Sequence, residues 1–202
     1  MIAPKIKLCG LSREADIQAV NQLRPDYIGF VFFEKSSRYV SPDRARELKA
    51  LLAPGIQAVG VFVDAEPAFV SQLLDTGTID LAQLHGHEDE KYIAALRQLT
   101  SKPLIQAFKI SALEDVRRAE QISADYILLD HGAGGTGQAF DWSLIQFVQR
   151  PYFLAGGLHP DNVQDAIRTL HPYALDVSSG IETEKVKDPQ KMQLFVERAR
   201  EA

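Results

Sequence analysis

Near its N-terminus the chain reads Ile6-Lys7-Leu8-Cys9-Gly10-Leu11-Ser12, a short apolar strand that runs into a turn with a single glycine. An open, doubly wound α/β sheet usually carries a glycine-rich GxGxxG turn after its first strand. The turn here lacks that pattern. This stretch therefore favours the other common architecture of alternating strands and helices, the closed (β/α)8 barrel.

Short, β-rich apolar runs recur along the whole chain at intervals of about 20 to 30 residues, the length of one βα unit. The eight predicted strands cover residues 6–9, 27–33, 58–63, 81–85, 104–110, 126–130, 152–155 and 174–178. Proline-containing start signals predict helices over residues 43–52, 68–74, 162–170 and 190–200. Strict alternation requires parallel strands joined by crossovers. The sequence therefore predicts one α/β domain over residues 1–202, a single (β/α)8 TIM barrel.

The composition narrows the possible partners and compartments. The 202 residues are 46% hydrophobic and 24% charged, as in an ordinary globular domain. The net charge of −5 argues against nucleic acid and anionic membranes as main partners, because both attract a basic surface. One cysteine cannot form an intrachain disulfide, no secretory signal is apparent, and no apolar run reaches the roughly 20 residues that span a bilayer. We expect a cytoplasmic protein, with a monomer and a homodimer both open.

Polar side chains gather at the C-terminal ends of the predicted strands, where barrel enzymes hold their active sites. Cys9 ends the first strand on the same face as Lys5 and Lys7, and a nearby ammonium group lowers the pKa of a thiol. A lone cysteine is also often a small buried side chain, so both interpretations stay open. Asp130 ends the sixth strand, either as a cap or as a partly desolvated carboxyl that acts as a general acid.

Two glycine-rich turns follow the seventh and eighth predicted strands, where barrels commonly bind phosphate through backbone N–H groups. They contain Gly156-Gly157 and Ser179-Gly180. Either turn alone is weak, but the two together favour a phosphate site over ordinary turn glycines. The substrate is then a phosphorylated small molecule.

Three further candidates lie near the same end of the predicted barrel. Arg38 follows the second strand, where a guanidinium either holds a carboxylate through two hydrogen bonds or lies in solvent. His85 shares a strand face with Gln83 and is expected to point into the barrel mouth, as a ligand contact or as a structural histidine. Gly135 lies in Gly134-Gly135-Thr136-Gly137, a predicted flexible loop near the substrate.

A buried ion pair is predicted beneath Cys9. If the eighth strand pairs with the first, as closure of a barrel requires, Asp176 and Lys7 both point inward. We expect this pair to stabilise the barrel beneath the thiol and to shift the pKa of Cys9.

In their order along nearly the whole chain, these segments resemble the phosphoribosylanthranilate isomerases of tryptophan biosynthesis. The matching stretches are residues 7–11, 29–32, 36–38, 83–86, 129–130, 134–137, 140–142, 155–158, 160, 162 and 176–182. The resemblance implies an Amadori rearrangement of N-(5′-phosphoribosyl)anthranilate to 1-(2-carboxyphenylamino)-1-deoxyribulose 5-phosphate. That reaction is redox-neutral, so neither a cofactor nor a metal is expected.

The resemblance also implies roles for particular residues. Asp130 matches the general acid that protonates the ribose ring oxygen, and Cys9 matches the general base that removes the C2′ proton. Arg38 matches the residue that faces the anthranilate carboxylate. The expected phosphate-binding residues are Gly156, Gly157, Ser179 and Gly180. The remaining residues expected to bind substrate are His85, Gly135 and Asp176.

Two other functions are compatible with parts of the pattern. Another sugar-phosphate barrel, such as an epimerase or a thiamin-phosphate-type synthase, would share the phosphate turns but not the pair Cys9 and Asp130. Such epimerases usually use metal-binding histidines and carboxylates, and the five histidines here form no such set. A non-catalytic barrel that binds a phosphorylated ligand is the alternative outside the enzymes.

Overall fold

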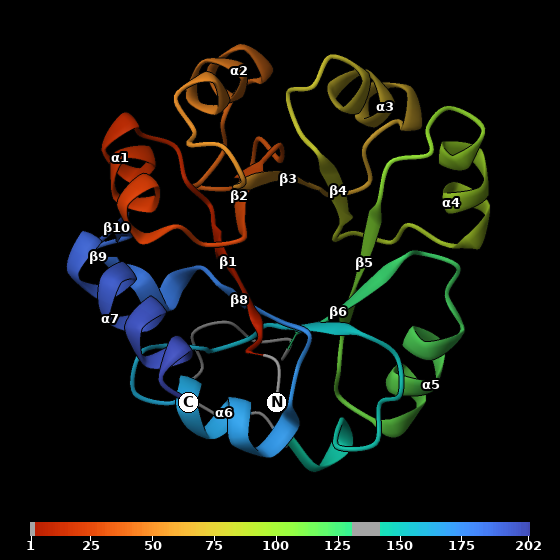
Figure 1. The fold of residues 1–202 in the computed structure, drawn as a ribbon. Coiled ribbons are helices and arrows are strands. Elements are labelled where there is room, and N and C mark those ends of the chain that lie inside the picture. Colours follow the sequence, from red (N-terminus) through yellow and green to blue (C-terminus); the bar gives the residue numbers. More distant parts are fainter. Residues whose placement is uncertain (1–2, 131–141) are drawn as a thin grey trace.

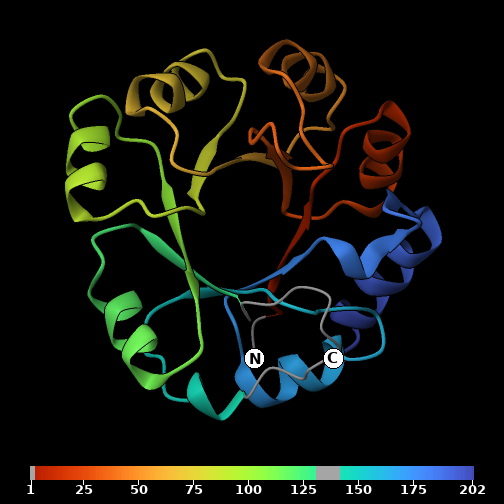
Figure 2. The same cartoon turned by 180° about the vertical axis from the view of Figure 1, so that it is seen from behind.

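The computed structural model describes residues 3–130 and 142–202, and its strands close into a barrel of eight parallel strands, seen from its two ends in Figure 1 and Figure 2. The strands are β1 (Lys5–Cys9), β2 (Tyr27–Val31), β3 (Gln57–Phe62), β4 (Leu81–Leu84), β5 (Leu104–Lys109), β6 (Tyr126–Asp130), β7 (Tyr152–Leu154) and β8 (Ala174–Val177). Each strand pairs with the next, and β8 closes the barrel on β1. The predicted α/β barrel is confirmed.

Helices surround the strands (Figure 1). Within the described residues the α-helices are α1 (Glu14–Leu23), α2 (Pro42–Ala50), α3 (Pro67–Asp75), α4 (Glu90–Arg97), α5 (Leu113–Gln121), α6 (Val163–Leu170) and α7 (Pro189–Arg200). Two of the predicted start signals act as caps: the Ser41 hydroxyl accepts from the Arg44 N–H at 3.2 Å, and the Asp188 carboxylate accepts from the Gln190 N–H at 2.9 Å.

Strand alternation divides the core into two layers. On β1, Ile6 and Leu8 are buried outside the barrel, in the cluster that packs against the helices. The inner layer contains Tyr27, Val59, Leu81, Ile105, Ala107, Leu128, Phe153, Ala155 and Ala174. Each large apolar side chain buried in this way contributes about 1.5–3 kcal/mol. Lys7, Cys9 and Asp176 lie on the inward-facing positions above this layer, so the barrel interior changes from apolar to polar toward its C-terminal end.

The structure departs from the simplest eightfold pattern in two places. Between β6 and β7, the described residues hold a short 3-10 turn, η1 (Trp142–Leu144), and not an α-helix. After β8, a second 3-10 turn, η2 (Ser179–Ile181), leads into a hairpin of β9 (Glu182–Thr183) and β10 (Val186–Lys187). The sequence did not predict this hairpin, because two-residue strands carry no periodic signal.

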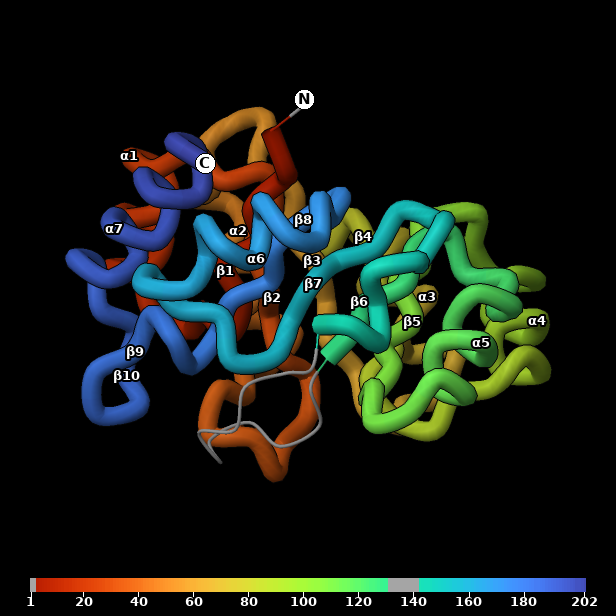
Figure 3. Tube along the Cα trace, turned by 90° about the horizontal axis from the view of Figure 1, so that it is seen from below, coloured from red at the N-terminus to blue at the C-terminus, as the bar shows by residue number. Residues whose placement is uncertain are grey.

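The start of β1 and the C-terminus lie at one end of the barrel (Figure 3). The loop between β2 and α2 and the β9–β10 hairpin lie toward the other end, where the strands finish. Among the described residues, no helix combines the length and the apolar character needed to cross a membrane.

Candidate active site

The C-terminal end of the barrel brings the predicted polar residues together through one chain of contacts. Lys7 Nζ donates to Asp176 Oδ1 at 2.9 Å and to Gln83 Oε1 at 2.8 Å. Gln83 Nε2 lies 2.8 Å from His85 Nδ1, and His85 Nε2 lies 3.6 Å from Asp130 Oδ2. The chain therefore crosses the barrel from β8 to β6 and confirms the predicted Asp176–Lys7 pair.

Burial differs sharply along this chain. Lys7 is fully buried, and Asp176 is 8% exposed. The side chains of His85 and Asp130 are 36% and 30% exposed, so they can meet a bound molecule. Burial alone would lower the pKa of Lys7, but the contact with Asp176 raises it overall, so the ammonium stays charged inside the barrel.

Cys9 lies at the end of β1, buried beside Val31 and Val61. Burial raises the pKa of its thiol, and this effect outweighs the ammonium groups of Lys7 and Lys187, which lower it. The predicted effect of Lys7 on the thiol therefore has the right sign, but burial, which the sequence argument did not include, raises the pKa overall. The free energy that the thiolate loses by leaving water is larger than the electrostatic stabilisation that the two ammonium groups supply.

Asp176→Asn is expected to lower the pKa of the Cys9 thiol. The carboxylate of Asp176 raises that pKa, and its removal leaves the positive charge of Lys7 to act on the thiol alone. Ultraviolet absorbance of the thiolate against pH measures this directly, because Cys9 is the single cysteine. Asp165→Asn, on the exposed face of α6, is the control that leaves the titration unchanged. An unchanged titration in Asp176→Asn would show that the ion pair does not act on Cys9.

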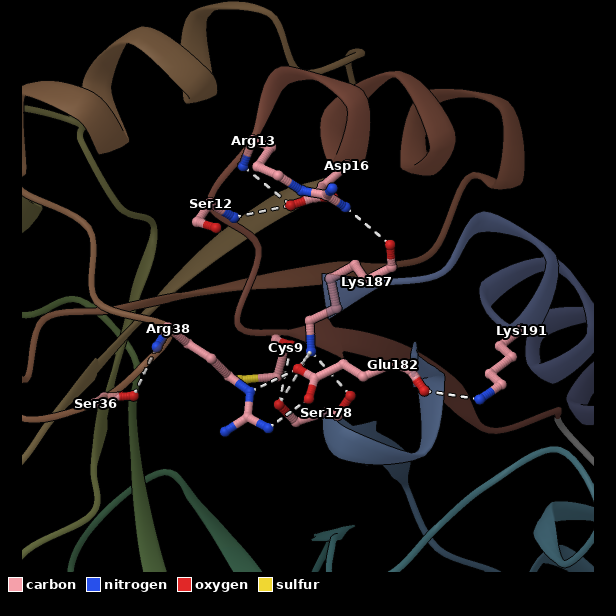
Figure 4. A network of polar contacts seen from close by, with 10 residues as sticks. All are labelled: Cys9, Ser12, Arg13, Asp16, Ser36, Arg38, Ser178, Glu182, Lys187 and Lys191. Atoms are coloured by element: carbon pink, nitrogen blue, oxygen red, sulfur yellow. Dashed lines mark hydrogen bonds and ion pairs between the residues drawn. The ribbon is translucent and has the colours of Figure 1, made fainter. Parts of the chain in front are cut away.

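A second polar network joins the loop after β2 to the β9–β10 hairpin (Figure 4). Arg38 donates from Nε and Nη2 to the two carboxylate oxygens of Glu182, each at 2.7 Å. Lys187 Nζ donates to Glu182 Oε1 at 2.6 Å and to the Ser178 carbonyl at 2.9 Å. The Ser178 hydroxyl in turn donates to the Cys9 carbonyl at 3.2 Å, so this network reaches the end of β1.

In this second network the cations of Arg38 and Lys187 stabilise the charged form of the Glu182 carboxylate. Burial alone would raise the pKa of Glu182, but hydrogen bonds from Arg38 and Lys187 lower it overall. Burial lowers the pKa of Lys187. In the sequence, Glu182 is part of the matching stretch 176–182 but is given no role, and Lys187 is not predicted as a site residue. The short hairpin returns Lys187 beside Glu182, and nothing in the local sequence indicates that return.

The two predicted phosphate turns lie side by side. Gly156 and Gly157 adopt positive φ angles of 85° and 68° after β7. A Cβ at Gly180 would lie 1.9 Å from the Leu158 carbonyl oxygen, so only glycine allows the turn after β8 to approach the turn after β7 this closely. Ser179 begins η2 next to this contact and is exposed. Of the other predicted binding residues, Gly135 lies outside the described residues.

The described residues offer no group of three or more histidine, cysteine, aspartate or glutamate side chains arranged to hold a metal ion. The polar groups that they do bring together are a thiol, a carboxyl group, an imidazole and a paired guanidinium. Such a set suits proton transfer on a bound anion.

Comparison with known proteins identifies the family. The model of the family N-(5′-phosphoribosyl)anthranilate (PRA) isomerase matches residues 6–198. The N-(5′-phosphoribosyl)anthranilate isomerase of Endomicrobium trichonymphae is 43% identical over 193 residues, 94% of each chain. The crystal structure of phosphoribosyl anthranilate isomerase from Thermotoga maritima has 34% identity and a TM-score of 0.89, covering 98% of this chain and 100% of that one.

A further crystal structure of a phosphoribosyl anthranilate isomerase, in complex with reduced 1-(o-carboxyphenylamino)-1-deoxyribulose 5-phosphate, has 33% identity and a TM-score of 0.86. That match covers 98% of this chain and 100% of the other. The chain therefore belongs to the phosphoribosylanthranilate isomerases, the isomerase family of tryptophan biosynthesis that its motifs predicted.

Proposed function

We propose that this barrel catalyses the Amadori rearrangement of N-(5′-phosphoribosyl)anthranilate with Asp130 as the general acid and Cys9 as the general base. The observation that carries the proposal is their placement. Asp130 ends β6 beside His85, and Cys9 ends β1 beside Lys7, on the end of the barrel that also holds the turns after β7 and β8. An acid and a base at separate strand ends suit a reaction with two proton transfers at different atoms.

The proposed reaction proceeds in three steps. Asp130 gives its proton to the ribose ring oxygen as the C1′–O4′ bond breaks, and the nitrogen lone pair forms a C1′=N iminium. The iminium makes the C2′ hydrogen acidic, and Cys9 removes it as the thiolate, a form that the ammonium groups of Lys7 and Lys187 favour against the effect of burial. The C2′–H electron pair then forms C1′=C2′, and the iminium electrons return to nitrogen. The resulting enolamine tautomerises to the ketone, so no electrons leave the substrate.

Local donors offset the charge of −5 that the whole chain carries. Phosphate is proposed to bind the backbone N–H groups of the turns that contain Gly156, Gly157, Ser179 and Gly180. Glu182 engages Nε and Nη2 of Arg38, which leaves the Nη1 edge to meet the anthranilate carboxylate. His85 and Asp176 complete the proposed site through their contacts with Asp130 and Lys7. The relative that holds the reduced product supports a ligand of this chemistry.

The decisive experiment follows the fluorescence of phosphoribosylanthranilate after the purified protein is added. We expect a decay proportional to enzyme concentration, with the carboxyphenylamino-deoxyribulose phosphate as product. Another sugar-phosphate barrel would leave the fluorescence unchanged. Tight binding of the reduced product without turnover would favour a non-catalytic binding barrel, and either of those outcomes would overturn the proposal.

Arg38→Ala is expected to raise KM roughly 10- to 100-fold, with a smaller change in kcat. The substitution removes charge-assisted hydrogen bonds of about 1.5–3 kcal/mol that hold the substrate before and during the reaction. Steady-state kinetics with phosphoribosylanthranilate separates the two constants. Arg44→Ala removes a guanidinium of α2 from ion pairs with Glu14 of α1 and Glu47 of α2, and should change neither constant. A loss confined to kcat would count against a binding role for Arg38.

A further inference from the structure

The proton on His85 can be placed from the contacts of its neighbours. Lys7, Gln83, His85 and Asp130 form a continuous series from β1 through β4 to β6. Lys7 and Gln83 are buried, with exposed fractions of 0% and 1%, so solvent does not compete for these contacts. Each group in the series constrains the hydrogen-bonding direction of the next.

Lys7 sets the orientation of the Gln83 amide. An ammonium group only donates hydrogen bonds, so the amide atom 2.8 Å from Lys7 Nζ must be the oxygen. A flipped amide would turn its own N–H groups toward the ammonium inside the barrel. Asp176 raises the pKa of Lys7, which keeps this donor charged.

The oriented amide then sets the imidazole. The NH2 group of Gln83 only donates, and it lies 2.8 Å from His85 Nδ1. Nδ1 must therefore offer its lone pair. A proton on Nδ1, whether in the other neutral tautomer or in the imidazolium, would face the hydrogens of the amide.

We propose that Gln83, held by Lys7, locks His85 as the neutral tautomer with its proton on Nε2, and that Gln83 is a positioning residue for the general acid. His85 Nε2 lies 3.6 Å from Asp130 Oδ2, and hydrogen bonds between catalytic groups are often this long until a substrate is bound. Its N–H then donates to Asp130 and stabilises the carboxylate that forms once the proton has passed to the ring oxygen. The functional part of this inference rests on the proposed role of Asp130.

On this proposal His85 faces Asp130 as a neutral imidazole that can donate from Nε2, and the pair is not a salt bridge. A salt bridge would require the imidazolium, which carries a second proton on Nδ1. His87, the next histidine in the chain, gives the opposite arrangement: its Nδ1 lies 2.9 Å from the Asp64 carboxylate, which raises the pKa of His87. His87 is therefore an internal control, with a proton on Nδ1.

The test is ¹⁵N NMR of the uniformly labelled full chain at neutral pH, with two-bond imidazole correlations and His85→Asn to assign the signals. We expect His85 to show a proton on Nε2 alone, and His87 to show a proton on Nδ1. A proton on Nδ1 of His85 in the wild-type chain would overturn the lock. This measurement needs no substrate, so it stands apart from the activity assay.

Gln83→Glu tests the positioning role. The new carboxylate accepts from Lys7 and also from His85, so we expect a proton on Nδ1 of His85. Nε2 then competes for the proton of Asp130, and kcat should fall about 10- to 100-fold, the same scale as the loss of a group that orients a metal-ligating histidine. KM should change little. Gln98→Glu, exposed at the end of α4, is the matched control and should alter neither the NMR signals nor kcat.

The outcomes separate the two proposals. An unswitched tautomer in Gln83→Glu, or a switched tautomer with unchanged kcat, would overturn the role of Gln83 while leaving the proposed reaction intact. The expected tautomer in a chain that does not turn over phosphoribosylanthranilate would instead reject the proposed reaction and, with it, the positioning role.

Discussion

Replacing Asp130 with asparagine is expected to lower kcat by about 10²- to 10⁴-fold, the range for loss of a general acid or base. Asparagine keeps the shape of the side chain and an oxygen that can accept from His85, but it cannot supply the proton for ring opening. The side chain is 30% exposed, so the expected cost in folding free energy is about 1 kcal/mol or less. Single-turnover kinetics, together with thermal unfolding, measures both effects.

Cys9→Ala is the companion variant, with an expected fall in kcat in the same range of about 10²- to 10⁴-fold. Alanine removes one buried sulfur, at a cost of roughly 1 kcal/mol, and leaves the ring-opening acid in place. A base forms no bond to carbon, so mass spectrometry of the wild-type enzyme during turnover should find no adduct on Cys9. Near-wild-type kcat in either variant would falsify the assigned role.

The sequence predicted the strand order of the barrel because repeat length and strand alternation are local properties. It predicted β6 to the residue and placed the end of β2 two residues too late, at Phe33. Phe32 lies beyond the end of β2, and its ring stacks on that of Phe62 with the ring centroids 5.2 Å apart. A run of apolar residues indicates that they are buried, whereas the end of a strand depends on where its pairing with the neighbouring strand ends.

The sequence predicts a site contact where the alternation of side chains along neighbouring strands determines which residues face the barrel interior. Inward-facing positions on adjacent strands gave the Lys7–Asp176 pair. This alternation does not indicate which side chains meet across the barrel interior. The hydrogen bond from Lys7 to Gln83 is therefore seen only in the three-dimensional structure. The pKa of the Cys9 thiol depends on how deeply the thiol is buried beside Val31 and Val61, and no local sequence pattern indicates that burial.

Lys7→Met is expected to destabilise the barrel by about 3–5 kcal/mol, the cost of leaving one charge of a buried ion pair without its partner. Methionine matches the length of the lysine stem, so packing changes little. Asp176, 8% exposed, loses the ammonium 2.9 Å away. Denaturant unfolding followed by circular dichroism measures the free energy. Lys5→Met is the control on the same strand, because Lys5 is partly exposed and lies 4.0 Å from Asp26.

The double variant Lys7→Met with Asp176→Leu separates stability from function. Replacing both charges by apolar groups of similar size is often close to neutral, so we expect most of the lost stability to return. Activity should not return with it, because Lys7 lowers the pKa of the Cys9 thiol and orients Gln83. A folded double variant with low kcat would mean that the buried pair serves proton transfer. Recovery of kcat together with stability would mean that Lys7 and Asp176 only hold the barrel together.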